Sequence, residues 1–167
     1  SKVDMTALPD DKLIGGVYQT AVKGVYELDL SQYKVQTAGA SGKTGTVTIK
    51  IGGQTVATAK VTSRGNGQSV ALTALTSGGV KTVTIGSTTF SVQVAGTKVT
   101  LTMKEDPTSE FKDSMAVTVS GSGDGVAATQ PGTNGNQGET LGVKVTTAPE
   151  VAQTRVWAQG DIDLSKL

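Results

Sequence analysis

The chain has 167 residues, of which 22 are Gly, 36% are hydrophobic, 17% are charged and 4% are aromatic, and its formal net charge is +1. This length fits one domain, or a small domain with ordered extensions, and the abundance of Thr, Val, Gly and Ser favours strands and turns. Because Cys and His are both absent, disulfides, thiolate metal sites and every catalytic arrangement that needs either residue are excluded.

Residues 1–15 are polar and are expected to form an N-terminal arm. After the arm, apolar and polar residues alternate in short segments, which predicts strands separated by Gly-containing turns. The clearest turn is Gly52-Gly53, a two-residue hairpin loop in which both positions tolerate positive φ. The expected strands of this part of the chain are 17–22, 25–30, 33–37, 46–51, 54–61, 68–76, 80–85, 88–94 and 98–103.

Short strands with turns at regular spacing predict an all-β fold, namely an antiparallel β-sandwich of Ig-like or jelly-roll-like type with extended terminal arms. We expect three parts. Residues 1–30 hold the N-terminal arm and the first strands, and residues 31–104 form an autonomous basic β-sandwich. The expected core consists of apolar residues with a period of two: Val47, Ile49, Ile51, Val70, Leu72, Val83, Ile85, Phe90, Val92, Val99 and Leu101.

The third part, residues 105–167, is expected to be an acidic C-terminal β region. Its strands are expected at 115–120, 141–147 and 154–158, and a polar tail follows them. Residues 121–138 form a Gly-rich loop of eighteen residues without apolar periodicity. Such a stretch is unusual inside a compact domain and indicates a functional or mobile loop.

The side chains left for catalysis are carboxylates, Lys, Tyr and Ser. Acids such as those of Glu105-Asp106 lie in turns, where a solvated role is the ordinary one. Residues 121–125 lack the ending of a phosphate-binding loop, and the spacing of Asp124, Asn134 and Asn136 fits no known Ca²⁺ loop. We therefore expect no catalytic residue, no cofactor and no metal, so that the protein is not an enzyme.

Charge is segregated along the sequence. No acid lies between Leu30 and Glu105, whereas residues 1–30 carry a balance of −2 and residues 105–167 a balance of −5. Two interpretations stay open: the lysines guard strand edges against aggregation, or they bind an acidic protein surface. Nucleic acid is disfavoured because the cations are spread out and have few aromatic neighbours. The candidate partner-binding residues are Lys34, Lys43, Lys50, Lys60, Arg64, Lys81 and Lys98.

A Thr/Gly/Val-rich β-module, as in Thr46–Val61 and Thr82–Thr102, is combined here with polar ends at 1–15 and 159–167 and with no expected signal peptide. In this texture the chain resembles small virion structural proteins of tailed bacteriophages, in particular capsid decoration or cement proteins with Ig-like domains. The resemblance implies a non-enzymatic homo-oligomer that is located in the virion, assembled in the host cytoplasm, and bound to the major capsid protein or another virion protein. It implies neither a nucleic-acid nor a membrane partner, and no functional residue is carried over.

Two alternatives stay open, of which the first has much the same composition. One is a bacterial cell-surface or adhesin Ig-like module, which would carry a signal peptide or neighbouring repeats in its full gene. The other is a carbohydrate-binding jelly-roll module, which needs exposed aromatic residues beyond Trp157. In the virion interpretation the terminal arms are disordered in the free protein and become ordered on binding, and attachment weakens as salt rises.

Overall fold

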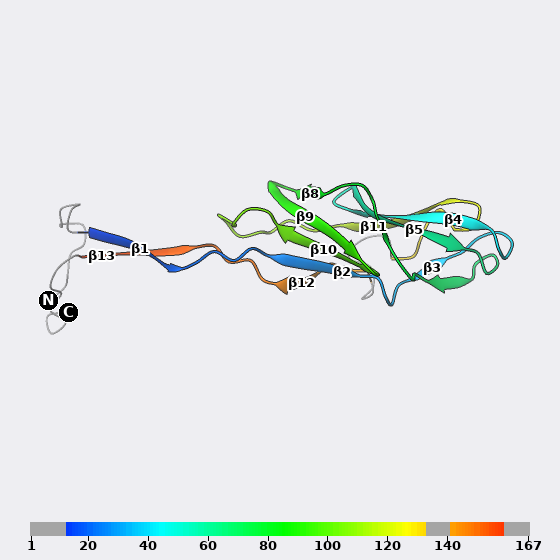
Figure 1. Ribbon diagram of the computed structural model, residues 1–167, viewed down its shortest axis with the longest axis horizontal. Helices are drawn as coiled ribbons and strands as arrows, with labels where there is room; N and C mark the ends of the chain where they lie inside the picture. Colours follow the sequence, from blue (N-terminus) through cyan, green and yellow to red (C-terminus); the bar gives the residue numbers. More distant parts are fainter. Residues whose placement is uncertain (1–12, 133–140, 159–167) are drawn as a thin grey trace.

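The computed structural model of the chain describes residues 13–132 and 141–158, with side chains described for 19–132 and 141–154. These residues form strands and turns only, so the expected all-β class is confirmed (Figure 1). In chain order the strands are β1 (Leu13–Gln19), β2 (Val25–Asp29), β3 (Lys34–Gln36), β4 (Thr44–Ile51), β5 (Gln54–Thr62), β6 (Ser69–Ala71), β7 (Thr76–Ser77), β8 (Thr82–Ile85), β9 (Thr88–Ala95), β10 (Lys98–Met103), β11 (Val117–Gly123), β12 (Lys144–Thr147) and β13 (Gln153–Ala158).

Two antiparallel sheets pack together as a sandwich. One sheet has five strands in the order β12-β2-β10-β9-β8, and the other has four in the order β11-β4-β5-β7. Strands β3 and β6 form a small two-stranded sheet beside them. Strands β1 and β13 form a separate two-stranded ribbon, which projects from one end of the sandwich (Figure 1). We call this element the ribbon.

The hairpin of β4 and β5 forms as the sequence predicts. Gly52 and Gly53 have φ values of 59° and 80°, and positive φ at both central positions gives the turn a twist that matches its flanking strands. The register shifts after Ile49, so that Val56 is an extra residue in β5. This bulge lets the neighbours Val56 and Ala57 both be buried, although strict alternation would bury only one of them.

The core lies between the two sheets. Of the eleven expected core residues, nine are buried, and Val70 and Val92 are partly buried and pack against them. Three aromatic rings meet edge to face in this core: Tyr26, Phe90 and Phe111, with ring centroids 5.4–5.9 Å apart. Such T-shaped contacts stabilise a core beyond the area that the rings bury.

The three expected parts do not coincide with the layers of the fold. Strand β2, from the expected first part, lies between β12 and β10, and β11, from the third part, forms an edge of the four-stranded sheet. Strand β1 begins at Leu13, so residues 13–15 belong to the ribbon rather than to an arm, while 1–12 and 159–167 lie outside the described residues. Residues outside 31–104 are fully buried in the core: Leu28, Leu30, Val117, Val119 and Leu141.

These five buried side chains decide whether a part of the chain folds alone. Burying one such side chain contributes about 1.5–3 kcal/mol, and a domain is stable by only about 5–15 kcal/mol. We therefore expect a fragment of residues 31–104 to be unfolded, whereas a fragment of 19–152, which keeps all five, folds without the ribbon. Circular dichroism and amide NMR dispersion of the two fragments test this expectation. A cooperative thermal transition in the 31–104 fragment would instead establish it as an autonomous sandwich.

Candidate functional site

Three loops meet at the end of the sandwich opposite the ribbon. They are residues 37–43, 63–68 and 124–132, and we call them the distal loops. Backbone hydrogen bonds join them: Ser63 N–H donates to the Lys43 carbonyl at 2.7 Å, and Ala38 N–H donates to the Gly125 carbonyl at 3.2 Å. Loops that are joined in this way form one continuous surface rather than three separate connections.

Two buried hydroxyl groups hold the first two loops together. Thr37 Oγ1 lies 2.8 Å from the Gly65 carbonyl oxygen and 2.9 Å from that of Gln68, to one of which it donates. Ser63 Oγ donates to the Gly39 carbonyl at 3.2 Å and accepts from Gly65 N–H at 3.1 Å. Both side chains are almost completely buried. Because a buried polar group is costly to leave unpaired, these contacts fix the loop conformation.

Gln130 holds the third loop in the same manner. Its Nε2 donates to the carbonyls of Gln36 at 3.0 Å and Ala127 at 2.8 Å, and its Oε1 accepts from Gln36 N–H at 2.7 Å. The side chain is 2% exposed. Its hydrogen bonds to the Gln36 backbone take the place of those that a neighbouring strand would make with β3. Tyr33 Oη adds a hydrogen bond to the Pro131 carbonyl at 2.6 Å.

These contacts correct the expected boundaries of the Gly-rich loop, 121–138. Strand β11 continues to Gly123, and Val126 is buried and forms a β-bridge with Thr37. The Gln130 side chain is held by its hydrogen bonds to backbone atoms. The segment up to residue 132 is therefore structured, and 133–140, with the two asparagines considered for Ca²⁺, lies outside the described residues. The role of Gln130 cannot be predicted from the sequence, because its partners are backbone atoms, which every residue type has.

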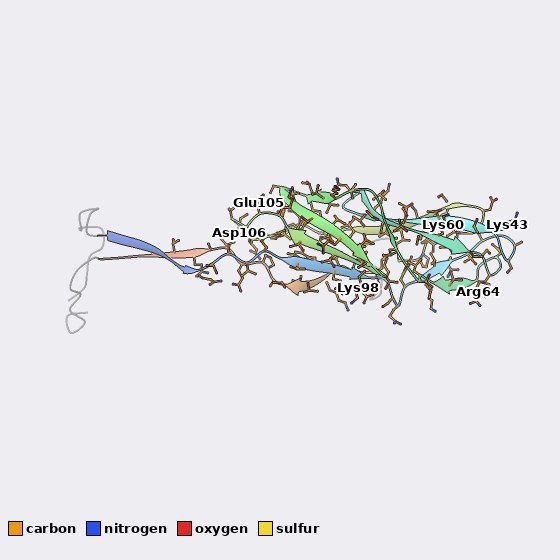
Figure 2. The ribbon with its side chains drawn as sticks, in the orientation of Figure 1. Lys43, Lys60, Arg64, Lys98, Glu105 and Asp106 are labelled. Atoms are coloured by element: carbon orange, nitrogen blue, oxygen red, sulfur yellow. The ribbon has the colours of Figure 1, made fainter. Side chains whose placement is uncertain are left out.

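Three of the seven candidate partner-binding residues gather at this end: Lys43, Lys60 and Arg64 (Figure 2). Lys43 adjoins Ser63 and Arg64 through the loop contacts, and Lys60 pairs in register with Thr46 at the same end of β4. All three side chains are exposed, and no salt bridge involves them within the described part of the chain. The charged residues of the described distal loops are Lys43, Arg64 and Asp124, so the net charge of these loops is positive.

The other candidates lie outside the distal loops, although β3, which carries Lys34, leads directly into loop 37–43. Lys98 is on the five-stranded sheet, where its Nζ lies 3.8 Å from Glu27 Oε1. Lys34 lies on β3, and Lys50 lies near the far end of β4. Lys81 precedes β8. The structure therefore does not unite the seven residues, and the pairing of Lys98 makes it a poor contributor to a basic surface.

Asp29 belongs to the same mixed-charge region as Lys98. A hydrogen bond from Ser31 N–H, 2.9 Å from Oδ1, holds the pKa of the Asp29 carboxyl below its usual value, with smaller contributions from Lys98 and Lys144. This carboxylate is solvent-exposed, so its ionic contacts contribute little to stability. Acids and bases balance here, unlike at the distal loops.

Acidic residues gather at the end of the sandwich that faces the ribbon, where Glu105 and Asp106 lie (Figure 2). Beside them a cleft of about 490 Å³ is lined by Tyr26, Phe111 and Val145 among others. Its charged residues are Glu110, Asp113 and Lys112, whose Nζ lies 3.9 Å from Glu110 Oε2, so acids outnumber bases here. Val145 is 57% exposed. The sandwich thus has a basic end and an acidic end along its length.

The described residues contain no group of three or more acidic side chains that could hold a metal ion. Nor does any helix within the described ranges have the length and apolarity needed to cross a membrane. The expectation that the protein has no catalytic site and no metal stays a prediction.

Comparisons with protein-family models, with curated proteins and with solved structures each gave no match.

The role of Gln130 can be measured by substitution. Gln130→Ala leaves the amide of Gln36 and the carbonyl of Ala127 without a partner, while the Gln36 carbonyl keeps its hydrogen bond from Ala127 N–H. We expect the free energy of unfolding to fall by roughly 2–4 kcal/mol in urea denaturation, because each buried unpaired group costs about 1–3 kcal/mol. The matched control is Gln93→Ala, at an exposed strand position, which should change stability by about 0.5 kcal/mol or less. Equal effects of the two changes would contradict the structural role of Gln130.

Tyr33 gives the distal loops a dependence on alkaline pH. Burial raises the pKa of the Tyr33 hydroxyl from 10.0 to about 12. Because the folded-state pKa is above the unfolded one, this stabilising contribution is complete below pH 10 and is lost as the pH rises toward 12. We expect Tyr33→Phe to lower stability by about 1 kcal/mol at pH 8, through loss of the hydrogen bond to Pro131.

The difference in stability between wild type and Tyr33→Phe should then shrink as the pH rises from 10 toward 12. Urea unfolding at a series of pH values measures it, and other titrating groups cancel because both proteins contain them. A difference that stays constant over this pH range would show that Tyr33 does not titrate as proposed.

Proposed function

We propose that this chain is a non-enzymatic structural protein of a bacteriophage virion, of the capsid decoration or cement type. It attaches to the major capsid protein or another virion protein, forms a homo-oligomer, and is located in the virion after assembly in the host cytoplasm. Neither nucleic acid nor a membrane takes part in this attachment, and no cofactor is required.

The observation that carries the attachment role is the basic, fixed surface of the distal loops. Lys43 and Arg64 are exposed there on a backbone held by buried polar contacts, and Lys60 is exposed at the adjoining end of β5. An exposed ion pair contributes only about 0–1 kcal/mol, so one such surface binds weakly. A repeating acidic shell that many copies engage together compensates for weak single contacts, and this is the situation of a decoration protein.

The bacteriophage part of the proposal comes from sequence texture, as in Thr46–Val61 and Thr82–Thr102. A bacterial surface or adhesin module of Ig-like type has the same fold class and composition and is the main alternative. The two differ in where the protein is found, on purified particles or on a cell envelope. Immunogold labelling of both fractions separates them.

A carbohydrate-binding jelly roll is the further alternative. Such modules present flat aromatic faces to sugar rings. Here Phe111, which lines the cleft, packs edge to face against Tyr26 and Phe90. This arrangement is typical of a core and favours the attachment role over a sugar site.

The charge surface is tested by reversing it. We expect Lys43→Glu, Lys60→Glu and Arg64→Glu together to weaken binding to purified particles of the encoding phage by at least about tenfold, because attraction becomes repulsion at three points. Binding of wild-type protein should also weaken as salt rises, since surface charges are screened within about 8–10 Å. Cosedimentation with particles at several salt concentrations measures both effects.

The matched control carries three reversals elsewhere, Lys50→Glu, Lys81→Glu and Lys104→Glu, at exposed positions away from the distal loops. It has the same net charge as the test variant and should bind nearly as well as wild type. Equal losses in both variants would show that only net charge matters. Absence of the protein from purified particles would refute the virion role itself.

A further inference from the structure

The ribbon has no structural partner within the described part of the chain. Strands β1 and β13 pair only with each other, with Ile14 opposite Trp157 and Val17 opposite Thr154. The ribbon stands apart from both sheets of the sandwich (Figure 1). Both of its edges therefore have strand backbone groups without a neighbouring strand.

An isolated pair of strands is at best marginally stable in water, and three or more strands with an apolar face are needed for independent stability. No tight turn connects the two strands and stabilises their pairing, because β1 and β13 are far apart in the sequence. Their pairing is supported at the base of the ribbon, where the Val22 and Glu150 backbones exchange hydrogen bonds of 2.8 and 2.9 Å. This support does not extend along the ribbon.

The composition of the ribbon is that of a buried element. Strand β1 reads LIGGVYQ and β13 reads QTRVWA, so Arg155 is the one charged residue of both strands. Apolar residues occupy both alternating sets of positions, with Leu13 and Val17 in one set and Ile14 in the other. A strand pair with one solvated face would instead alternate apolar and polar residues.

Gly15 and Gly16, in the middle of β1, are a second sign that the ribbon has a close neighbour. Glycine weakens the interior of a strand, and it often occurs where another backbone approaches closely. Register places the pair opposite Val156 and Arg155. Two adjacent glycines therefore leave room on both sides of β1, which a close neighbour can occupy.

We propose that the ribbon is a self-association element, in which the ribbon of a second copy of this chain packs against it to complete a four-stranded unit. A second copy fits because the ribbon is almost uncharged and apolar at both sets of positions, so an identical ribbon supplies apolar surface without an uncompensated charge cluster. A two-fold interface uses the same surface of the ribbon on both copies. This inference names the interface of the homo-oligomer in the proposed function, on which it rests.

Trp157 gives the test a built-in reporter, because it is the only Trp of the chain and lies in the ribbon. The full-length protein is studied by sedimentation velocity and by Trp fluorescence over a dilution series. We expect a two-copy mass at micromolar concentration. Trp emission should shift to longer wavelength as dilution separates the copies.

The disrupting variant is Ile14→Glu with Val17→Glu, which introduces charge at both sets of ribbon positions. We expect its self-association to be at least about 100-fold weaker, with the thermal unfolding of the sandwich unchanged. The control is Val145→Glu, an equivalent change at an exposed apolar residue of the sandwich, which should stay dimeric.

Three results would overturn the proposal: a monomeric wild type at high micromolar concentration, a disrupting variant that stays dimeric, or a Val145→Glu variant that becomes monomeric. A stable wild-type mass other than two copies contradicts the two-fold arrangement. If self-association behaves as expected but the protein does not bind particles, the virion role fails and the ribbon interface stands.

Discussion

The pairing of β2 with both β10 and β12 is the constraint on which the rest of the molecule depends. It inserts a strand from the start of the chain between one from the middle and one from the end. Met103 N–H donates to the Gly24 carbonyl at 3.0 Å, and the Val22–Glu150 bridge follows directly. The segments before β2 and after β12 must therefore leave the sandwich side by side at one end, where β1 and β13 pair as the ribbon. The opposite end is left to loops.

Those loops are rigid because of close backbone packing as well as buried polar side chains. A Cβ at Gly125 would overlap the Lys43 carbonyl oxygen, and one at Gly121 would overlap that of Ala127. Glycine at these two positions permits an approach that any other residue would block. The glycines of this region therefore serve contact between chain segments, which is a different role from the flexibility that their abundance suggests.

The sequence predicts the fold class and most of the core because both depend on local signals. Alternation places Val47 and Ile49 on the buried face of β4, and Gly52-Gly53 specifies the turn that follows. The order of strands in the sheets depends on pairing between distant segments, which alternation does not encode. Gln130 and the gathering of Lys43 with Arg64 depend on loop-to-loop contacts of the same long-range kind, so the site was predicted only in part. Charge segregation along the chain predicts that basic and acidic residues lie in different parts of the fold. Lys98 is an exception, because this lysine of the acid-free segment lies next to Glu27 in space.

In the proposed role, the strength and the spacing of attachment depend on different ends of the molecule. In the proposed dimer, two copies that are joined at their ribbons carry two sets of distal loops, one on each copy. Once one set contacts a repeating shell, the second binds at a raised effective concentration, so contacts of about 0–1 kcal/mol each can add to a stable attachment. This gain requires that the span between the two sets match the repeat of the shell, and a stiff connection meets this requirement better than a flexible one. For the proposed attachment, the buried contacts of Thr37, Ser63 and Gln130 are therefore as important as the exposed cations, because they fix the loops that carry Lys43 and Arg64.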